Sequence, residues 1–116
     1  LEQSNYQTRT ALSYITQKIH QNDLIDSISL QQIDQKDVLV LKSSYSQGEY
    51  TTYLYEDKGY LKELFISNQL EFDKNDGKKI MPVSHLKMQQ INPYLYHFSC
   101  IVDHKEINTN VAIQSK

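Results

Sequence analysis

The sequence predicts an α+β domain in which an N-terminal α-helix packs on an antiparallel β-sheet. Between about Tyr6 and Gln21, apolar residues recur at helical spacing. From Ile25 onward, apolar residues alternate with polar ones or form short apolar runs, which is typical of strands. A chain of 116 residues, 39% of them hydrophobic, can bury its own core. We therefore expect residues 1–116 to form a single domain of two layers, helix on sheet.

The expected helix carries a narrow apolar stripe. Leu12, Ile15 and Ile19 lie at positions i, i+3 and i+7, so they share one face of the helix. Asn22 and Asp23 end the pattern, because their side chains compete for local backbone hydrogen bonds. We expect Leu12, Ile15 and Ile19 to form the contact between helix and sheet.

The first half of the strand-like region predicts two hairpins. Residues 38–41 are a continuous apolar run, typical of a strand deep in a sheet, and a turn is expected just before them at residues 35–37. Residues 49–56 and 60–66 are rich in Tyr, Thr and Leu, and Gly59 between them suits a turn position with positive φ.

The second half begins with a polar segment, residues 67–82, which is expected to be a loop or a tight hairpin tip. Leu86 and Met88 alternate with polar neighbours and indicate a short strand that ends before Pro93. Residues 94–102 and 107–113 alternate cleanly and predict a last pair of strands joined by a turn at residues 103–105.

Composition argues against several function classes. The formal net charge is -2 and no basic cluster stands out, so no nucleic-acid partner is predicted. No run of roughly 18 apolar residues is present, so no membrane span is predicted within this sequence. With 3 Gly, the chain has little material for a phosphate-binding loop. We therefore predict no cofactor and no small-molecule substrate.

Neither a metal centre nor a catalytic centre is predicted. Asp73, Asn75 and Asp76 surround Gly77, but this glycine stands at the fifth rather than the sixth position of a calcium loop, so a solvated turn is the better interpretation. Cys100 is the only cysteine, and in an extended strand it points away from the face of His97. An enzyme would require His97, Cys100 and Asp103 to converge in a pocket.

Tyrosines and a polar loop form the candidate interaction surface. Tyrosine binds partners at a low cost in conformational entropy, although packing within a sheet explains the same residues equally well. The residues of this candidate surface are Tyr50, Tyr53, Tyr55, Asp73, Asn75 and Asp76.

Three blocks, residues 9–23, 37–42 and 53–64, carry a family resemblance. They are similar to the second half of a pilin helix, a following strand, and a tyrosine-rich hairpin with an acidic-Gly turn. The chain resembles the soluble domain of type IV pilin-like proteins, especially minor pseudopilins of type II secretion and of Gram-positive competence systems. The resemblance implies a non-enzymatic subunit that initiates or caps a filament and has other pilin-like subunits as partners.

In that family a membrane-anchoring half-helix, missing from this sequence, would precede the domain and pack in the filament core. The resemblance therefore implies an extracytoplasmic location, at the cell surface or anchored in the membrane. The alternative hypothesis is a secreted or surface-anchored cystatin-like binding module, in which a curved sheet wraps a helix around a pocket. Both start with a helix followed by strands, so the order of elements does not separate them.

Overall fold

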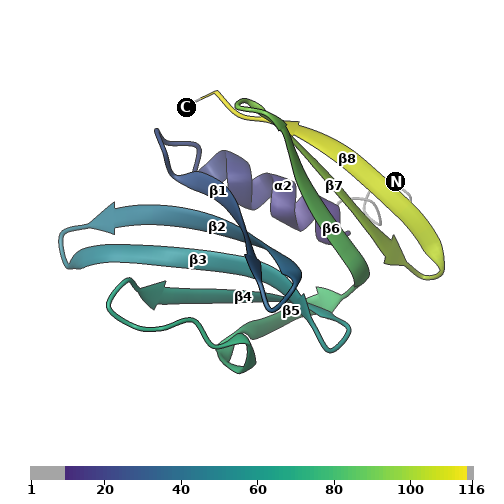
Figure 1. Ribbon diagram of the computed structural model, residues 1–116, viewed down its shortest axis with the longest axis horizontal. Helices are drawn as coiled ribbons and strands as arrows, with labels where there is room; N and C mark the ends of the chain where they lie inside the picture. Colours follow the sequence, from purple (N-terminus) through teal and green to yellow (C-terminus); the bar gives the residue numbers. More distant parts are fainter. Residues whose placement is uncertain (1–9, 115–116) are drawn as a thin grey trace, which may run out of the picture.

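The computed structural model describes residues 10–114 and shows one α-helix, one short 3-10 helix and eight strands in two antiparallel sheets (Figure 1). The predicted fold class, one sheet with a helix laid across it, is therefore wrong: the domain is a β-rich sandwich. The elements are α2 (Ala11–Gln21), β1 (Ile28–Ile33), β2 (Lys36–Tyr45), β3 (Gly48–Asp57), β4 (Tyr60–Ser67), the 3-10 helix η1 (Lys74–Asp76), β5 (Lys78–Pro82), β6 (Ser84–Asn92), β7 (Leu95–Val102) and β8 (Lys105–Ala112).

Each sheet is a meander of strands in chain order. Sheet A has the order β1-β2-β3-β4-β5 and sheet B the order β6-β7-β8. The chain passes from one to the other at Val83, directly after Pro82. Proline lacks the N–H that would continue a ladder, so it suits the end of an edge strand. This crossing separates strands that the alternating pattern alone had assigned to a single sheet.

Tight turns close three of the hairpins. Residues 34–35, 58–59 and 103–104 each place two consecutive residues at positive φ, between 51° and 83°. Such pairs match the right-handed twist of the strands they join. The turn predicted at residues 35–37 lies instead at 34–35, because Lys36 and Asp37 already pair with β1.

Helix α2 begins at Ala11. Thr10 is extended, with φ -75° and ψ 159°, and its side chain accepts a hydrogen bond from the Ser13 backbone N–H, which is an N-cap. The predicted helical residues from Tyr6 to Arg9 lie outside the described part of the chain. Within residues 10–114, no helix is long and apolar enough to cross a membrane.

The main core lies between the two sheets and α2. Leu12, Ile15 and Ile19 are buried there, and Ile15 and Ile19 have 0% exposure. They belong to one cluster with Leu39 and Leu54 from sheet A and with buried residues of sheet B. The helix is thus in contact with both sheets. The sheet B members of the cluster are Leu86, Met88, Tyr96, Phe98, Cys100 and Val111, and Ile113 directly after β8 joins them.

A second, smaller core covers the outer face of sheet A. It consists of Val38, Val40, Tyr55 and Leu64, with Phe72 packed against them. Phe72 comes from the polar segment that the sequence predicted to be a loop or a tight hairpin tip. That segment, residues 67–82, also contains β5. The strand was not recognised in the sequence because it begins with two polar residues, Lys78 and Lys79, and therefore shows no alternation of apolar and polar residues. Residues 68–77 join the antiparallel strands β4 and β5, so of the two predicted alternatives the hairpin tip is nearer to the structure than the loop.

Candidate functional site

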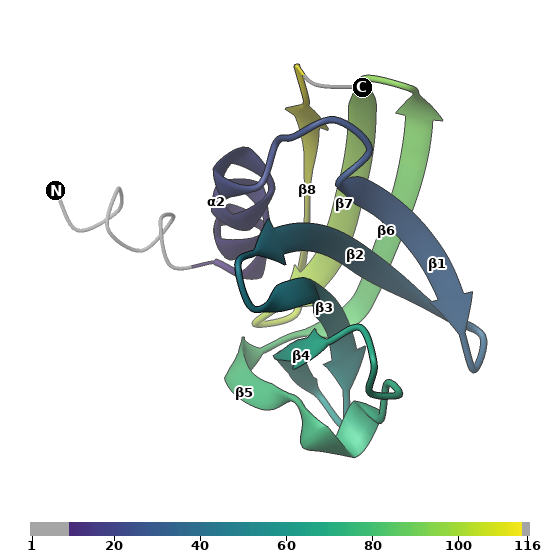
Figure 2. The ribbon, with the colours of Figure 1, turned by 90° about the vertical axis from the view of Figure 1, so that its left-hand side faces the viewer.

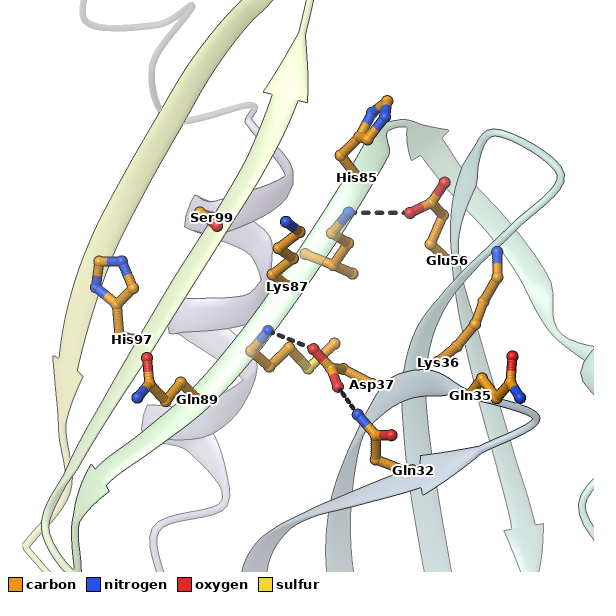
Figure 3. Close-up of a pocket in the computed structure, with 12 residues that line it drawn as sticks. Gln32, Gln35, Lys36, Asp37, Glu56, His85, Lys87, Gln89, His97 and Ser99 are labelled. Carbon is orange, nitrogen blue, oxygen red and sulfur yellow. Dashed lines mark hydrogen bonds between the residues drawn. The ribbon is translucent and has the colours of Figure 1, made fainter.

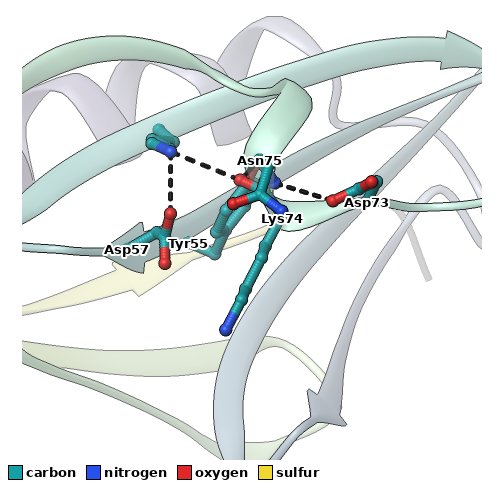
Figure 4. A network of polar contacts seen from close by, with 6 residues as sticks. Tyr55, Asp57, Asp73, Lys74 and Asn75 are labelled. Atoms are coloured by element: carbon teal, nitrogen blue, oxygen red, sulfur yellow. Dashed lines mark hydrogen bonds and ion pairs between the residues drawn. The ribbon is translucent and has the colours of Figure 1, made fainter.

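A polar network fastens the segment of residues 68–77 to the outer face of sheet A (Figure 4). The Tyr55 hydroxyl donates to the Lys74 carbonyl at 2.8 Å, and Lys62 Nζ approaches the same carbonyl at 3.4 Å. Lys62 Nζ also donates to Asp57 Oδ2 at 2.7 Å, and both side chains of this ion pair are less than a tenth exposed. The segment is therefore held by side chains of the sheet beneath it.

Burial and charge shift two pKa values in this network. The hydrogen bond from Lys62 is the largest cause that lowers the pKa of Asp57 below its ordinary value. Burial raises the pKa of Tyr55 to about 12, and the nearby carboxylates act in the same direction. At neutral pH the network thus holds a charged Asp57–Lys62 pair and a neutral Tyr55.

The six residues of the predicted interaction surface do not form one surface. Tyr55 is buried, and Tyr53 packs its ring against Phe72 at 4.7 Å between centroids. Tyr50 lies on the opposite face of the sheet, stacked on Phe65 at 5.2 Å. Asp73, Asn75 and Asp76 are exposed at η1, where the Asn75 backbone N–H donates to Asp73 Oδ1 in a local turn.

Gly77 provides a test of the fastened segment. A Cβ atom at this position would lie 2.1 Å from the Tyr55 hydroxyl oxygen and 2.9 Å from its Cζ, so Gly77→Ala is expected to destabilise the fold by about 1–3 kcal/mol. Urea unfolding followed by circular dichroism measures this loss. Tyr55→Phe is the partner variant, because it removes the clashing oxygen. A double variant whose loss equals the sum of the two single losses would contradict the contact.

An open cleft of about 770 Å³ lies where the two sheets part (Figure 3). Carboxylates from sheet A cross the cleft and accept hydrogen bonds from the free edge of β6. Glu56 Oε1 accepts from the Leu86 N–H and Asp37 Oδ2 accepts from the Met88 N–H, each at 2.9 Å. Gln32 Nε2 donates to the other oxygen of Asp37 at 2.5 Å. These side chains therefore connect the sheets to each other.

The enzyme hypothesis required His97, Cys100 and Asp103 to converge, and they do not. Cys100 is 1% exposed and faces the main core, where burial raises its pKa to about 11. His97 lies on the other face of β7, and its Nδ1 is 2.6 Å from the Asn110 side-chain oxygen. Asp103 is in the β7–β8 turn. Among residues 10–114, no three His, Cys, Asp or Glu side chains are grouped to hold a metal.

Exposed apolar side chains gather at one end of the domain. Within residues 10–114, the large hydrophobic side chains that are about half exposed or more all come from segments at this end. They belong to the α2–β1 loop, the end of β2, the end of β4 with the loop after it, and the end of β6 with the turn that follows it. We call this group the apolar end: Leu24, Ile25, Tyr45, Phe65, Leu70, Ile91 and Tyr94.

Hydrogen bonds join the segments of the apolar end. Asn22 Nδ2 donates to the Lys42 carbonyl at 3.0 Å, which ties the end of α2 to β2. The Gln114 N–H donates to Asp23 Oδ2 at 2.7 Å and the Ile113 N–H donates to the Tyr94 carbonyl at 2.8 Å. In Figure 1 the α2–β1 loop and the ends of β2 and β4 lie at the left, and the β6–β7 turn lies at the top; in Figure 2 that turn is again at the top.

The opposite end of the domain is polar. It carries the three tight turns at residues 34–35, 58–59 and 103–104, together with the start of α2. Every residue of these turns is exposed, and none is a large hydrophobic. Among residues 10–114, the exposed large hydrophobic side chains thus lie at the end of the domain where α2 ends, and the domain is asymmetric along the direction of α2.

Sequence reasoning missed the apolar end because its members come from segments far apart in the chain. One local signal was present: Leu24 and Ile25 are adjacent aliphatic residues between Asp23 and Asp26, in a segment with turn character. An apolar pair in such a segment is either buried by other parts of the chain or available to a partner.

The comparisons with known proteins give a family but no activity. The family described as Domain of unknown function (DUF4860) matches residues 6–103, which is most of the chain. No curated protein and no solved structure matches it.

Proposed function

Because the chain belongs to the DUF4860 family, whose description names no activity, we propose a function from its geometry: it is a non-catalytic subunit of a multi-subunit assembly. Its apolar end binds a neighbouring protein subunit. The observation that carries this proposal is the concentration of seven exposed large apolar side chains at one end of a domain whose other end is polar.

The composition of the apolar end fits a protein contact. Tyr45, Tyr50 and Phe65 form an aromatic cluster with ring centroids 5.2–6.2 Å apart. Aromatic side chains in such clusters supply much of the binding energy at protein interfaces. The exposed acids Asp26 and Glu49 lie nearby and would repel an anionic membrane surface. A protein is therefore favoured over a lipid bilayer as the partner.

The resemblance to pilin-like proteins gives the assembly a specific form, a pilus or pseudopilus-like filament at the cell surface. Two different ends on one domain favour head-to-tail contacts, which generate open filaments rather than closed dimers. Thr10 is extended, so α2 itself does not continue upstream of Ala11 as one unbroken rod. The proposal therefore depends on the apolar end and not on a continuous helix.

The test introduces charge at the apolar end of the natural full-length protein in its own cells. Leu24 and Ile25 are 62% and 72% exposed, so Leu24→Glu with Ile25→Glu should leave the melting temperature unchanged. We expect at least about tenfold less of the variant to be recovered with pilin-like subunits in filaments sheared from the cell surface. This corresponds to a loss of about 1.4 kcal/mol in the free energy of association.

The matched control places two glutamates at the polar end, with Lys58→Glu and His104→Glu, and should assemble as the wild type does. Equal recovery of the two double variants would contradict a role for the apolar end. Loss of binding to anionic liposomes, without any change in subunit association, would identify a membrane as the partner and would also contradict the proposal.

A further inference from the structure

The two sheets have four edge strands, and three of them are obstructed. β5 has five residues, a register shift and a terminal proline, Pro82. β6 has its free N–H groups at Leu86 and Met88 occupied by carboxylates of sheet A. β1 faces β6 across the cleft, and its Ile28 carbonyl accepts from the Tyr96 hydroxyl. Natural sheets commonly obstruct their edges in such ways, because an open edge pairs with other chains.

The fourth edge, β8, is regular. Its eight residues pair with β7 without a register shift, and it contains no proline or glycine. The two-residue turn at 103–104 makes Val102 and Lys105 a hydrogen-bonded pair, so alternate residues from Lys105 onward bond to β7. The other alternate residues direct their N–H and C=O away from β7, and all four are exposed: Glu106, Asn108, Asn110 and Ala112.

Helix α2 forms a wall beside this edge. In Figure 2 the strands of sheet B follow one another as β6, β7 and β8, and α2 stands beyond β8. A groove of about 900 Å³ lies between them. Thr16, Gln17 and His20 line its helix side, and Ile107 and Thr109 line its strand side. The inward side chains of a strand added to β8 would fill this groove.

We propose that β8 is a strand-addition site that takes one extended segment of a partner protein. The backbone of the segment pairs with Glu106, Asn108, Asn110 and Ala112. Its inward side chains are small or β-branched, because they meet threonine, glutamine and isoleucine across the groove. Main-chain hydrogen bonds give affinity in this mode and alternate side chains give specificity.

A second copy of the domain is a poorer occupant than a single strand. If β8 paired with β8 of a second copy about a twofold axis, the α2 helices of both copies would compete for the same space beside the paired strands. A single extended segment avoids this conflict. No residue that pairs in the proposed site belongs to the apolar end, so the inference does not depend on the proposed function.

The probe is a synthetic peptide of nine alternating threonine and valine residues with a lysine at each end. We expect saturable binding with a dissociation constant below about 1 mM, measured by NMR of the backbone amides. Amides of Asn108 and Asn110 should shift and exchange with solvent at least tenfold more slowly, whereas those of Ile107 and Thr109, already bonded to β7, should change little. Absence of binding, or shifts centred on another strand, would overturn the proposal.

Backbone chemistry provides the matched controls. Asn108→Pro removes an outward N–H and should weaken binding at least tenfold, whereas Asn108→Ser keeps the N–H and should bind as the wild type. If Asn108→Pro does not fold, peptides N-methylated on one or the other alternate set of residues decide the question. One set should abolish binding and the other should not. Equal effects of the two sets, or a wild type that dimerises through β8 in sedimentation, would overturn the proposal.

Discussion

Ile15→Asp is expected to unfold the domain. Ile15 is 0% exposed at the point where α2 meets both sheets, so the substitution removes a large aliphatic group and buries an unpaired charge. The expected loss is about 5 kcal/mol or more, comparable to the whole stability of many domains of this size. Far-UV circular dichroism during urea unfolding measures it.

Two variants control for the chemistry of this change. Gln17→Asp introduces the same side chain on the exposed face of α2 and should cost less than about 1 kcal/mol. Ile15→Val removes a single methylene group and should cost about 1 kcal/mol. A cooperative transition of Ile15→Asp at the wild-type urea concentration would contradict the position of α2 in the core.

Asp57→Asn is expected to cost about 3–5 kcal/mol, because it leaves the Lys62 ammonium buried without a counter-charge. The double variant Asp57→Asn with Lys62→Met removes both charges and should recover most of the loss. Urea unfolding at pH 7 compares the wild type, the single variant and the double variant. If the double variant is no more stable than Asp57→Asn alone, the pair does not interact as described.

Lowering the pH should remove the difference in unfolding free energy between the wild type and Asp57→Asn. The folded pKa of Asp57 is lower than its unfolded value of 3.8, so the stabilisation is complete above pH 3.8. It is lost as the pH falls through the folded pKa. The difference between the two unfolding free energies should therefore shrink from pH 7 to pH 2. A constant difference would contradict the charged state of Asp57.

Local patterns specified much of the fold. The spacing of Leu12, Ile15 and Ile19 identified the buried face of α2, because a helix places these positions on one side. Gly59 identified a turn, because its φ of 83° is one that few other residues adopt easily. Such features depend only on neighbours in the chain, and they are therefore visible in the sequence.

The division into two sheets was not predictable in the same way. Alternation tells which side chains share a face of a strand, but it does not tell which strands share a sheet. The sheets separate at Val83 and are joined by contacts such as Glu56 with the Leu86 N–H, which connect residues far apart in the chain. The cover of sheet A by Phe72 depends on equally distant partners.

The apolar end was missed in the sequence for a related reason. Tyr53 and Tyr55 were candidates for an interaction surface, but Phe72 packs against both rings. The sequence placed Ile25 at the start of the strand-like region and gave Leu24 no role, whereas both residues are exposed in the loop before β1. Exposure is a property of the assembled domain, so composition alone left both packing and an interface open for these tyrosines, and the structure packs Tyr53 and Tyr55 against Phe72.

Site-specific photo-crosslinking in cells that produce the natural full-length protein tests the central claim most directly. A photoreactive phenylalanine analogue at Phe65 samples the apolar end, and the same analogue at Lys58 samples the polar end. We expect Phe65 to yield a discrete adduct with a pilin-like subunit and Lys58 to yield none with the same surface of that subunit. A Phe65 position that forms no protein adduct, or forms adducts only with lipid, would contradict the assignment of the apolar end as a subunit contact.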